Sequence, residues 1–150
     1  MRKEHDFLGE LEVADELYYG VQTLRAMENF TITGKHLDRD FIKSMAMVKK
    51  ASALANMKTG RMDPTIGNAI VQAADEIIAG QWVEQFPIDP IQGGAGTSFN
   101  MNMNEVLANR GLEILGHAKG SYDIILQTTT ATWLSPRTIH SRQLLKCVLF

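Results

Sequence analysis

Three stretches of the chain repeat apolar residues at helical spacing, and this periodicity most narrows the folds open to it. The first stretch runs from about residue 40 to 58, after an aspartate that can cap its start, either Asp38 or Asp40. The second opens at Asp63-Pro64, and the third runs from about residue 102 to 115. Three helices of this length predict a mainly α-helical fold.

The same spacing predicts which faces are buried. In the first helix the expected buried residues are Phe41, Ile42, Met45, Val48, Ala51 and Ala55. The residues expected on its solvated face are Lys43, Lys49 and Lys50. Outside the three helices, residues 1–17 predict a short extended pair and residues 19–29 a short helix with Gly20 at its start. Residues 81–90 contain two prolines, which predicts an extended connection.

The segment from Gln92 to Glu105 gathers groups that suit an anion just before the third helix. It holds three glycines, a hydroxyl pair and three alternate asparagines. A glycine-rich turn that runs into a helix presents free backbone N–H groups, and Thr97 and Ser98 add side-chain donors. The segment therefore predicts a site for a carboxylate or a phosphate. On spacing alone, an ordinary loop that leads into a helix stays an open alternative.

Two nucleotide-binding patterns do not fit this segment. No lysine follows the last glycine, so the segment lacks the P-loop pattern. The glycines also lack the G-x-G-x-x-G spacing and the preceding strand of a dinucleotide-binding turn. Nucleotide binding is therefore disfavoured.

Composition excludes several classes of function. The formal net charge of −2 does not indicate a protein that binds nucleic acid or a basic patch that binds a membrane surface. No run is long and apolar enough to span a bilayer, and the first residues do not form a signal peptide. Cys147 is the single cysteine, and no Cys/His cluster has metal-ligand spacing. We expect a soluble cytoplasmic protein without a bound metal.

Long motifs resemble one family of enzymes. The run from Gln92 to Gly116 closely resembles the substrate-binding segment of the aspartase/fumarase superfamily of lyases, and Glu4–Glu10 and Leu17–Phe30 resemble its opening. The sequences of residues 18–23 (YYGVQT) and 93–98 (GGAGTS) are similar to those of aspartases (aspartate ammonia-lyases) rather than to those of class II fumarases. The resemblance covers about residues 2–125.

The resemblance implies a fold and a reaction. The fold would be the mainly helical N-terminal domain of a fumarase/aspartase-type enzyme, with a short extended N-terminal segment, truncated before the central helix bundle. The reaction would be the elimination of ammonia from L-aspartate to give fumarate, through a carbanion stabilised by a carboxylate, without a metal or organic cofactor. Thr97 matches the threonine that binds a substrate carboxylate, and Ser98 is its neighbour.

The resemblance also implies what the chain lacks. The family is homotetrameric, and several subunits build each active site. Its base is a serine on a mobile loop in a later segment, so this chain carries no catalytic residue and by itself is expected to be inactive. Two alternatives stay open: a class II fumarase that hydrates fumarate, and a non-catalytic helical module that acts through protein partners.

From Leu126 onward the resemblance stops. Shifting the reading frame by one base restores it, because permitted codons for residues 126–144 then encode Ser-Pro-Asn-Asp-His, one free position, and Met-Ala-Gln-Ser-Thr-Asn-Asp-Ser-Phe-Pro-Thr-Ala. This predicts two parts: a family domain at 1–125 and an out-of-frame tail at 126–150, with one base lost near the Ile125 codon. A divergent C-terminus of the protein is the alternative.

Overall fold

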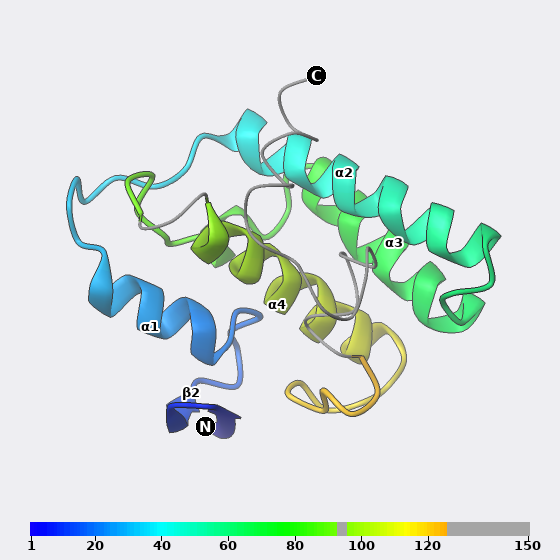
Figure 1. The fold of residues 1–150 in the computed structure, drawn as a ribbon, viewed down its shortest axis with the longest axis horizontal. Coiled ribbons are helices and arrows are strands. Elements are labelled where there is room, and N and C mark those ends of the chain that lie inside the picture. Colours follow the sequence, from blue (N-terminus) through cyan, green and yellow to red (C-terminus); the bar gives the residue numbers. More distant parts are fainter. Residues whose placement is uncertain (93–95, 126–150) are drawn as a thin grey trace.

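The computed structural model describes residues 1–92 and 96–125, and within them it has a mainly helical fold with one small sheet (Figure 1). Along the chain the elements are β1 (Arg2–Asp6), β2 (Gly9–Val13), α1 (Val21–Asn29), α2 (Arg39–Lys58), α3 (Pro64–Ile78), a short 3-10 helix (Val83–Gln85) and α4 (Thr97–Ile114). The mainly α fold and the extended N-terminal pair are confirmed. The predicted tail, 126–150, lies outside the described residues.

The two strands form an antiparallel hairpin, in which Arg2 lies opposite Val13 and Asp6 opposite Gly9. At the turn, the Asp6 carboxylate accepts a hydrogen bond from the backbone N–H of Leu8 at 2.8 Å. Arg25 of α1 donates to the same carboxylate at 2.9 and 3.0 Å. The hairpin is therefore fastened to the first helix.

Helix α4 is the central element, with α1 on one side and α3, backed by α2, on the other (Figure 1). The core contains Ile42 of α2, Ile77 of α3 and Met103 and Leu107 of α4, and Phe86 and Phe99 close it near the start of α4. From Asn102 to Asn109 every residue of α4 is buried. A helix buried all round must satisfy its polar side chains inside the protein.

Helices α2 and α3 start as the sequence predicts. Asp38 caps α2 by accepting a hydrogen bond from the N–H of Asp40 at 2.8 Å. Asp63 caps α3 by accepting from the N–H of Thr65 at 2.8 Å, and Pro64 occupies the first helical position, where it forfeits no helical hydrogen bond. Of the two candidate caps for α2, Asp38 is the one used.

About half of the residues predicted to be buried on α2 are exposed in the structure. Phe41, Ala51 and Ala55 are exposed, and the buried stripe is Ile42, Met45, Ala46, Lys49, Ala53 and Asn56. Lys49, expected on a solvated face, is only 1% exposed. The predicted set mixed the buried stripe through Ile42 with exposed apolar positions, and it left out Lys49, which is seven residues after Ile42 and shares its face.

Two boundaries also differ from the prediction. Helix α4 begins at Thr97 instead of about residue 102, so Thr97 and Ser98 belong to its first turn. The connection 81–90 is not extended throughout, because Val83–Gln85 form a 3-10 turn preceded by Trp82 with φ +61°. The ring of Trp82 packs edge-on against Tyr18, with ring centroids 4.8 Å apart.

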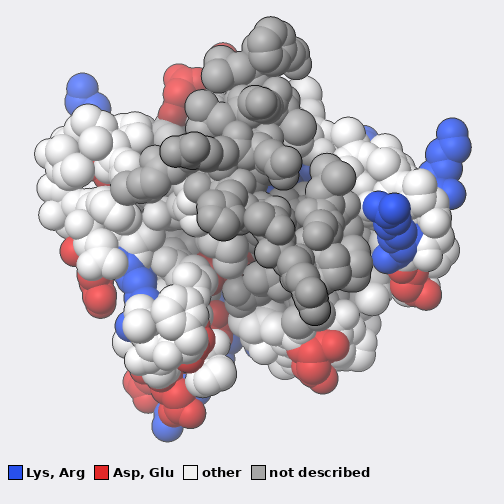
Figure 2. Space-filling model, viewed as in Figure 1, with Lys and Arg blue, Asp and Glu red and all other residues white. Residues whose placement is uncertain are grey.

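None of the helices in the described part of the chain is long and apolar enough to cross a membrane. Positive and negative side chains are interspersed around the margin of the face shown in Figure 2, in keeping with the small net charge.

Candidate functional site

The candidate site lies at the N-terminus of α4, where Gly96 precedes the helix with φ +79°. This left-handed conformation favours glycine, and Gly96 has no side chain to cap the helix. Thr97 is exposed and Ser98 half-buried, so two hydroxyls accompany the first backbone N–H groups of the helix. Helix N-termini carry partial positive charge, and this end therefore suits an anion. Gly93–Ala95 of the predicted turn lie outside the described residues.

A side chain from before the turn reaches the same helix end. The amide oxygen of Gln92 accepts a hydrogen bond from the N–H of Phe99 at 2.8 Å. Phe99 is the third helical residue, and its N–H has no acceptor within the helix. Gln92 thus satisfies the third amide, while those of Thr97 and Ser98 belong to the first two positions.

The three alternate asparagines do not act as one group. Asn100 accepts a hydrogen bond from the Lys49 ammonium at 2.5 Å, and Asn102 donates to the carbonyl of Gln85 at 3.0 Å. Asn104 is buried two turns into the helix. Asn100 is three residues after Thr97, so the two share a face of α4. The asparagine nearest the predicted anion site therefore carries a buried cation.

Burial lowers the pKa of Lys49 to about 7. Within residues 1–92 and 96–125, no carboxylate forms a salt bridge with Lys49, whereas its neighbour Lys50 pairs with Asp75 at 2.6 Å. Lys49 therefore adds positive potential close to the start of α4 when it is protonated, below this pKa, and is neutral above it.

A second helix N-terminus in the molecule already holds a carboxylate. The Glu105 side chain accepts hydrogen bonds from the N–H groups of Gly20, Gln22 and Thr23 at 2.9, 2.8 and 3.1 Å. It also accepts from the Thr23 hydroxyl at 2.6 Å. Burial raises the pKa of Glu105, the hydrogen bonds from Thr23, Gly20 and Gln22 limit the rise, and nearby Glu4 adds to it. Glu105 therefore anchors the start of α1 to α4.

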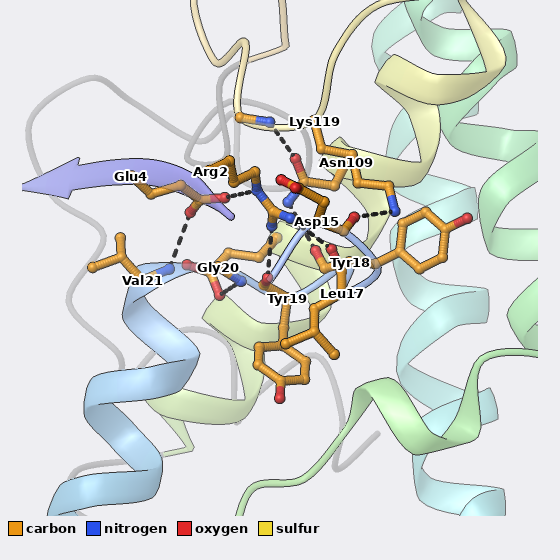
Figure 3. Close-up of polar contacts among 12 residues, drawn as sticks. Arg2, Glu4, Asp15, Leu17, Tyr18, Tyr19, Gly20, Val21, Asn109 and Lys119 are labelled. Carbon is orange, nitrogen blue, oxygen red and sulfur yellow. Dashed lines mark hydrogen bonds and ion pairs between the residues drawn. The ribbon is translucent and has the colours of Figure 1, made fainter. Parts of the chain in front are cut away.

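Glu4 completes this anchor (Figure 3). It accepts a hydrogen bond from the N–H of Val21 at 3.0 Å and pairs with Arg2 at 2.7 Å. Arg2 in turn donates to the carbonyl of Tyr19 at 2.9 Å. A Cβ atom on Gly20 would collide with the Glu4 carboxylate, so only glycine lets the chain approach this closely.

The described residues contain no group of three or more His, Cys, Asp or Glu side chains that could hold a metal ion. Asp75 and Glu76 are adjacent in α3 but do not form a pair, because Asp75 pairs with Lys50 and Glu76 with Arg110.

Comparison with known proteins identifies the family. Residues 9–133 match a sequence model that describes lyases. The chain belongs to this lyase family. Within the family, the chain is 61% identical over 121 residues to an aspartate ammonia-lyase of Bacillus subtilis (strain 168), covering 81% of this chain and 26% of the relative. It is 50% identical over 128 residues to the aspartate ammonia-lyase of Escherichia coli (strain K12), covering 83% and 27%.

Solved structures of lyases share the fold. A fumarate lyase:delta crystallin of Brucella melitensis superposes with a TM-score of 0.83 at 48% identity, covering 85% of this chain and 29% of that one. A class II fumarase of Schistosoma mansoni gives a TM-score of 0.75 at 38% identity, covering 79% and 26%. The chain thus spans about a quarter of the length of these lyases.

The structure places Thr97 and Ser98 in the first turn of α4, and their role as carboxylate ligands stays a prediction. Sequence reasoning missed Gln92 as a cap, Lys49 as a buried cation and Glu105 as an anchor. A helical stripe through Ile42 and Met45 could have found Lys49. The contacts of Gln92 and Glu105 join residues that are separated in the sequence, so no local sequence pattern predicts them.

Proposed function

We propose that this chain is the N-terminal part of an aspartate ammonia-lyase, and that Thr97 and Ser98 bind a carboxylate of L-aspartate or fumarate. The observation that carries the proposal is the N-terminus of α4, where Gly96 provides no side-chain cap, Gln92 accepts the Phe99 amide, and Thr97 is exposed in the first turn. The identity of 61% to one aspartate ammonia-lyase supports the choice of reaction.

The chemistry of the elimination explains why such a site is needed. A base removes a proton from the carbon beside one carboxylate, the electron pair delocalises into that carboxylate, and ammonia leaves as the double bond of fumarate forms. Negative charge therefore builds up on carboxylate oxygens. Fixed neutral donors, such as the Thr97 hydroxyl and the first amides of α4, stabilise this charge without reorganising solvent. When it is protonated, Lys49 adds positive potential one turn further along, where it donates to Asn100.

The 150-residue chain holds only part of such an active site, since it spans about a quarter of its relatives. We expect the purified chain to release no fumarate from L-aspartate. Fumarate formation, followed by its ultraviolet absorbance, would contradict this.

The role of Thr97 is best tested in a hybrid enzyme, in which residues 1–125 replace the matching segment of the Bacillus subtilis aspartate ammonia-lyase. If Thr97 donates to the developing charge, Thr97→Ala lowers kcat/KM by about 10²–10³. Thr65→Ala is the matched control, because Thr65 is also exposed in the first turn of a helix. Equal activities of the two variants would rule out Thr97 as a substrate ligand.

A fumarase is the rival activity, since the chain also superposes on a class II fumarase. The hybrid enzyme cannot separate the two, because most of it comes from the relative. The gene's own full-length product, assayed with L-aspartate and with L-malate, decides between them. We expect ammonia release from aspartate, and hydration of fumarate to malate as the main activity would overturn the proposal.

We further propose that residues 126–150 are read out of frame. The support is the codon argument: one base shifted near Ile125 returns the family's next motif over residues 126–144. Resequencing the gene from the codon of Gly116 past that of Phe150 tests this directly. An additional base restores an open lyase frame, whereas an unchanged sequence means that the gene itself encodes a truncated product.

A further inference from the structure

Gln92 connects the start of α4 to a fixed part of the protein. Its amide oxygen accepts the Phe99 N–H at 2.8 Å, and its amide nitrogen donates to the carbonyl of Asp89 at 3.4 Å. Both ends of the side-chain amide are thereby used, which fixes its orientation. The side chain bridges seven residues of sequence.

Asp89 is itself held firmly. It is 5% exposed, and its carboxylate accepts hydrogen bonds from the N–H and the hydroxyl of Thr33 at 2.6 and 2.9 Å. It also accepts from the N–H of Gly34 at 3.0 Å and that of Ile91 at 2.8 Å. A buried carboxylate with four donors is a rigid base for the segment that carries Gln92.

The two glycine-begun helices differ in the charge of the group that reaches their first turn. At α1 this group is the Glu105 carboxylate, which a helix N-terminus favours. At α4 it is the neutral amide of Gln92, although a carboxylate would serve the helix at least as well. Helix stability alone gives no reason for a neutral group, but an incoming dicarboxylate does, because like charges repel.

We propose that Gln92 is a positioning residue of the carboxylate site: it fixes the first turn of α4 through Phe99 while keeping negative charge away from Thr97 and Ser98. The identity of the ligand in this inference rests on the proposed function. The contact between Gln92 and Phe99 is independent of the proposed function.

The contact is tested on the 150-residue chain by NMR hydrogen exchange of the Phe99 amide. We expect Gln92→Ala to speed exchange at Phe99 by about tenfold, since an opened cap exposes the amide. Gln92→Glu keeps an acceptor in place and should preserve protection. The Ile66 amide at the Asp63 cap is the internal reference. Unchanged exchange at Phe99 in Gln92→Ala would overturn the positioning role.

The charge effect is tested in the hybrid enzyme with Gln92→Glu. We expect kcat/KM for L-aspartate to fall about tenfold, mainly through KM, and the gap to narrow as salt rises. Gln81→Glu makes the same charge change at an exposed glutamine in the turn after α3 and should leave kcat/KM within about twofold. Equal values for the two variants, or a loss in Gln92→Glu that salt does not narrow, would overturn the proposal, because glutamate also loses the donor to the Asp89 carbonyl and that loss alone is not screened by salt.

The outcomes separate this inference from the proposed function. A hybrid enzyme that keeps Gln92 but cannot turn over aspartate contradicts the proposed function. Calorimetric binding of fumarate to the same hybrid then still measures the charge effect, and Phe99 exchange in the 150-residue chain still decides the contact.

Discussion

The N-termini of α1 and α4 begin alike but are completed differently. Each follows a glycine that provides no side-chain cap, Gly20 in one case and Gly96 in the other. At α1 the buried carboxylates of Glu105 and Glu4 accept the first backbone amides. At α4, among the described residues, the neutral Gln92 is the side chain that accepts a first-turn amide, and Thr97 is exposed.

We infer a different role for each helix end from this difference. At α1, backbone amides and a threonine hydroxyl together donate hydrogen bonds to the carboxyl group of Glu105. The carboxylate at α1 is internal and permanent, so that end is structural. The same kinds of donor at α4 accompany an exposed threonine and a nearby cation, Lys49. We therefore expect changes at α1 to act on folding and changes at α4 to act on binding.

The largest effect should come from Glu105→Ala. It removes the acceptor of four hydrogen bonds and leaves buried donors unsatisfied, so the free energy of unfolding should fall by on the order of 4 kcal/mol. Urea unfolding followed by far-ultraviolet circular dichroism measures it. Glu28→Ala, an exposed change in α1, is the control. A loss below about 1 kcal/mol would mean that Glu105 does not anchor α1.

Thr23→Val isolates one bond of the same anchor. Valine keeps the shape but removes the hydroxyl that donates to Glu105 at 2.6 Å. A hydrogen bond to a charged group contributes about 1.5–3 kcal/mol, so the loss should be smaller than for Glu105→Ala. In the double variant, Thr23→Val should add little to Glu105→Ala, since its partner is already gone. Full additivity, measured by the same unfolding experiment, would contradict the contact.

Lys49→Met tests the cation beside α4. The folded pKa is about 7 and the unfolded one about 10.5, so between these values the unfolded chain holds a proton that the folded chain has lost. Stability of the native chain should therefore rise with pH across this window, by up to about 1.4 kcal/mol per unit. The rise should vanish in Lys49→Met and persist in Lys50→Met. Parallel curves for Lys49→Met and the native chain would show that Lys49 is not held in an apolar environment.

Local signals made most of the fold predictable. Asp38 and Asp63 stand next to the helices they cap, and the pair Asp63-Pro64 marked the start of α3. The start of α4 was placed too late, because its first turn carries Thr97, Ser98 and asparagine where an apolar pattern was sought. Apolar periodicity identifies helices that bury an apolar face. A helix that buries polar side chains lacks this periodicity, so its start is hard to predict.

The site was only partly predictable for the same reason. Thr97 and Ser98 are adjacent in sequence, so one motif predicts both. The anchor at α1 joins residues 82 or more positions apart, Gly20 and Thr23 with Glu105, and only the packing of α1 on α4 brings them together. Lys49 was misplaced by one helical position, which was enough to turn a buried cation into an expected surface residue.

The smallest effect completes the comparison, because it concerns a helix whose cap is local. Asp63→Ala removes the carboxylate that accepts the Thr65 N–H at 2.8 Å. The amide of this exposed cap can turn to water, so the loss should be about 1 kcal/mol, well below that for Glu105. Asp63→Asn keeps an acceptor and should recover most of it. A loss as large as that of Glu105→Ala would mean that burial is not what separates the anchor at α1 from an ordinary cap.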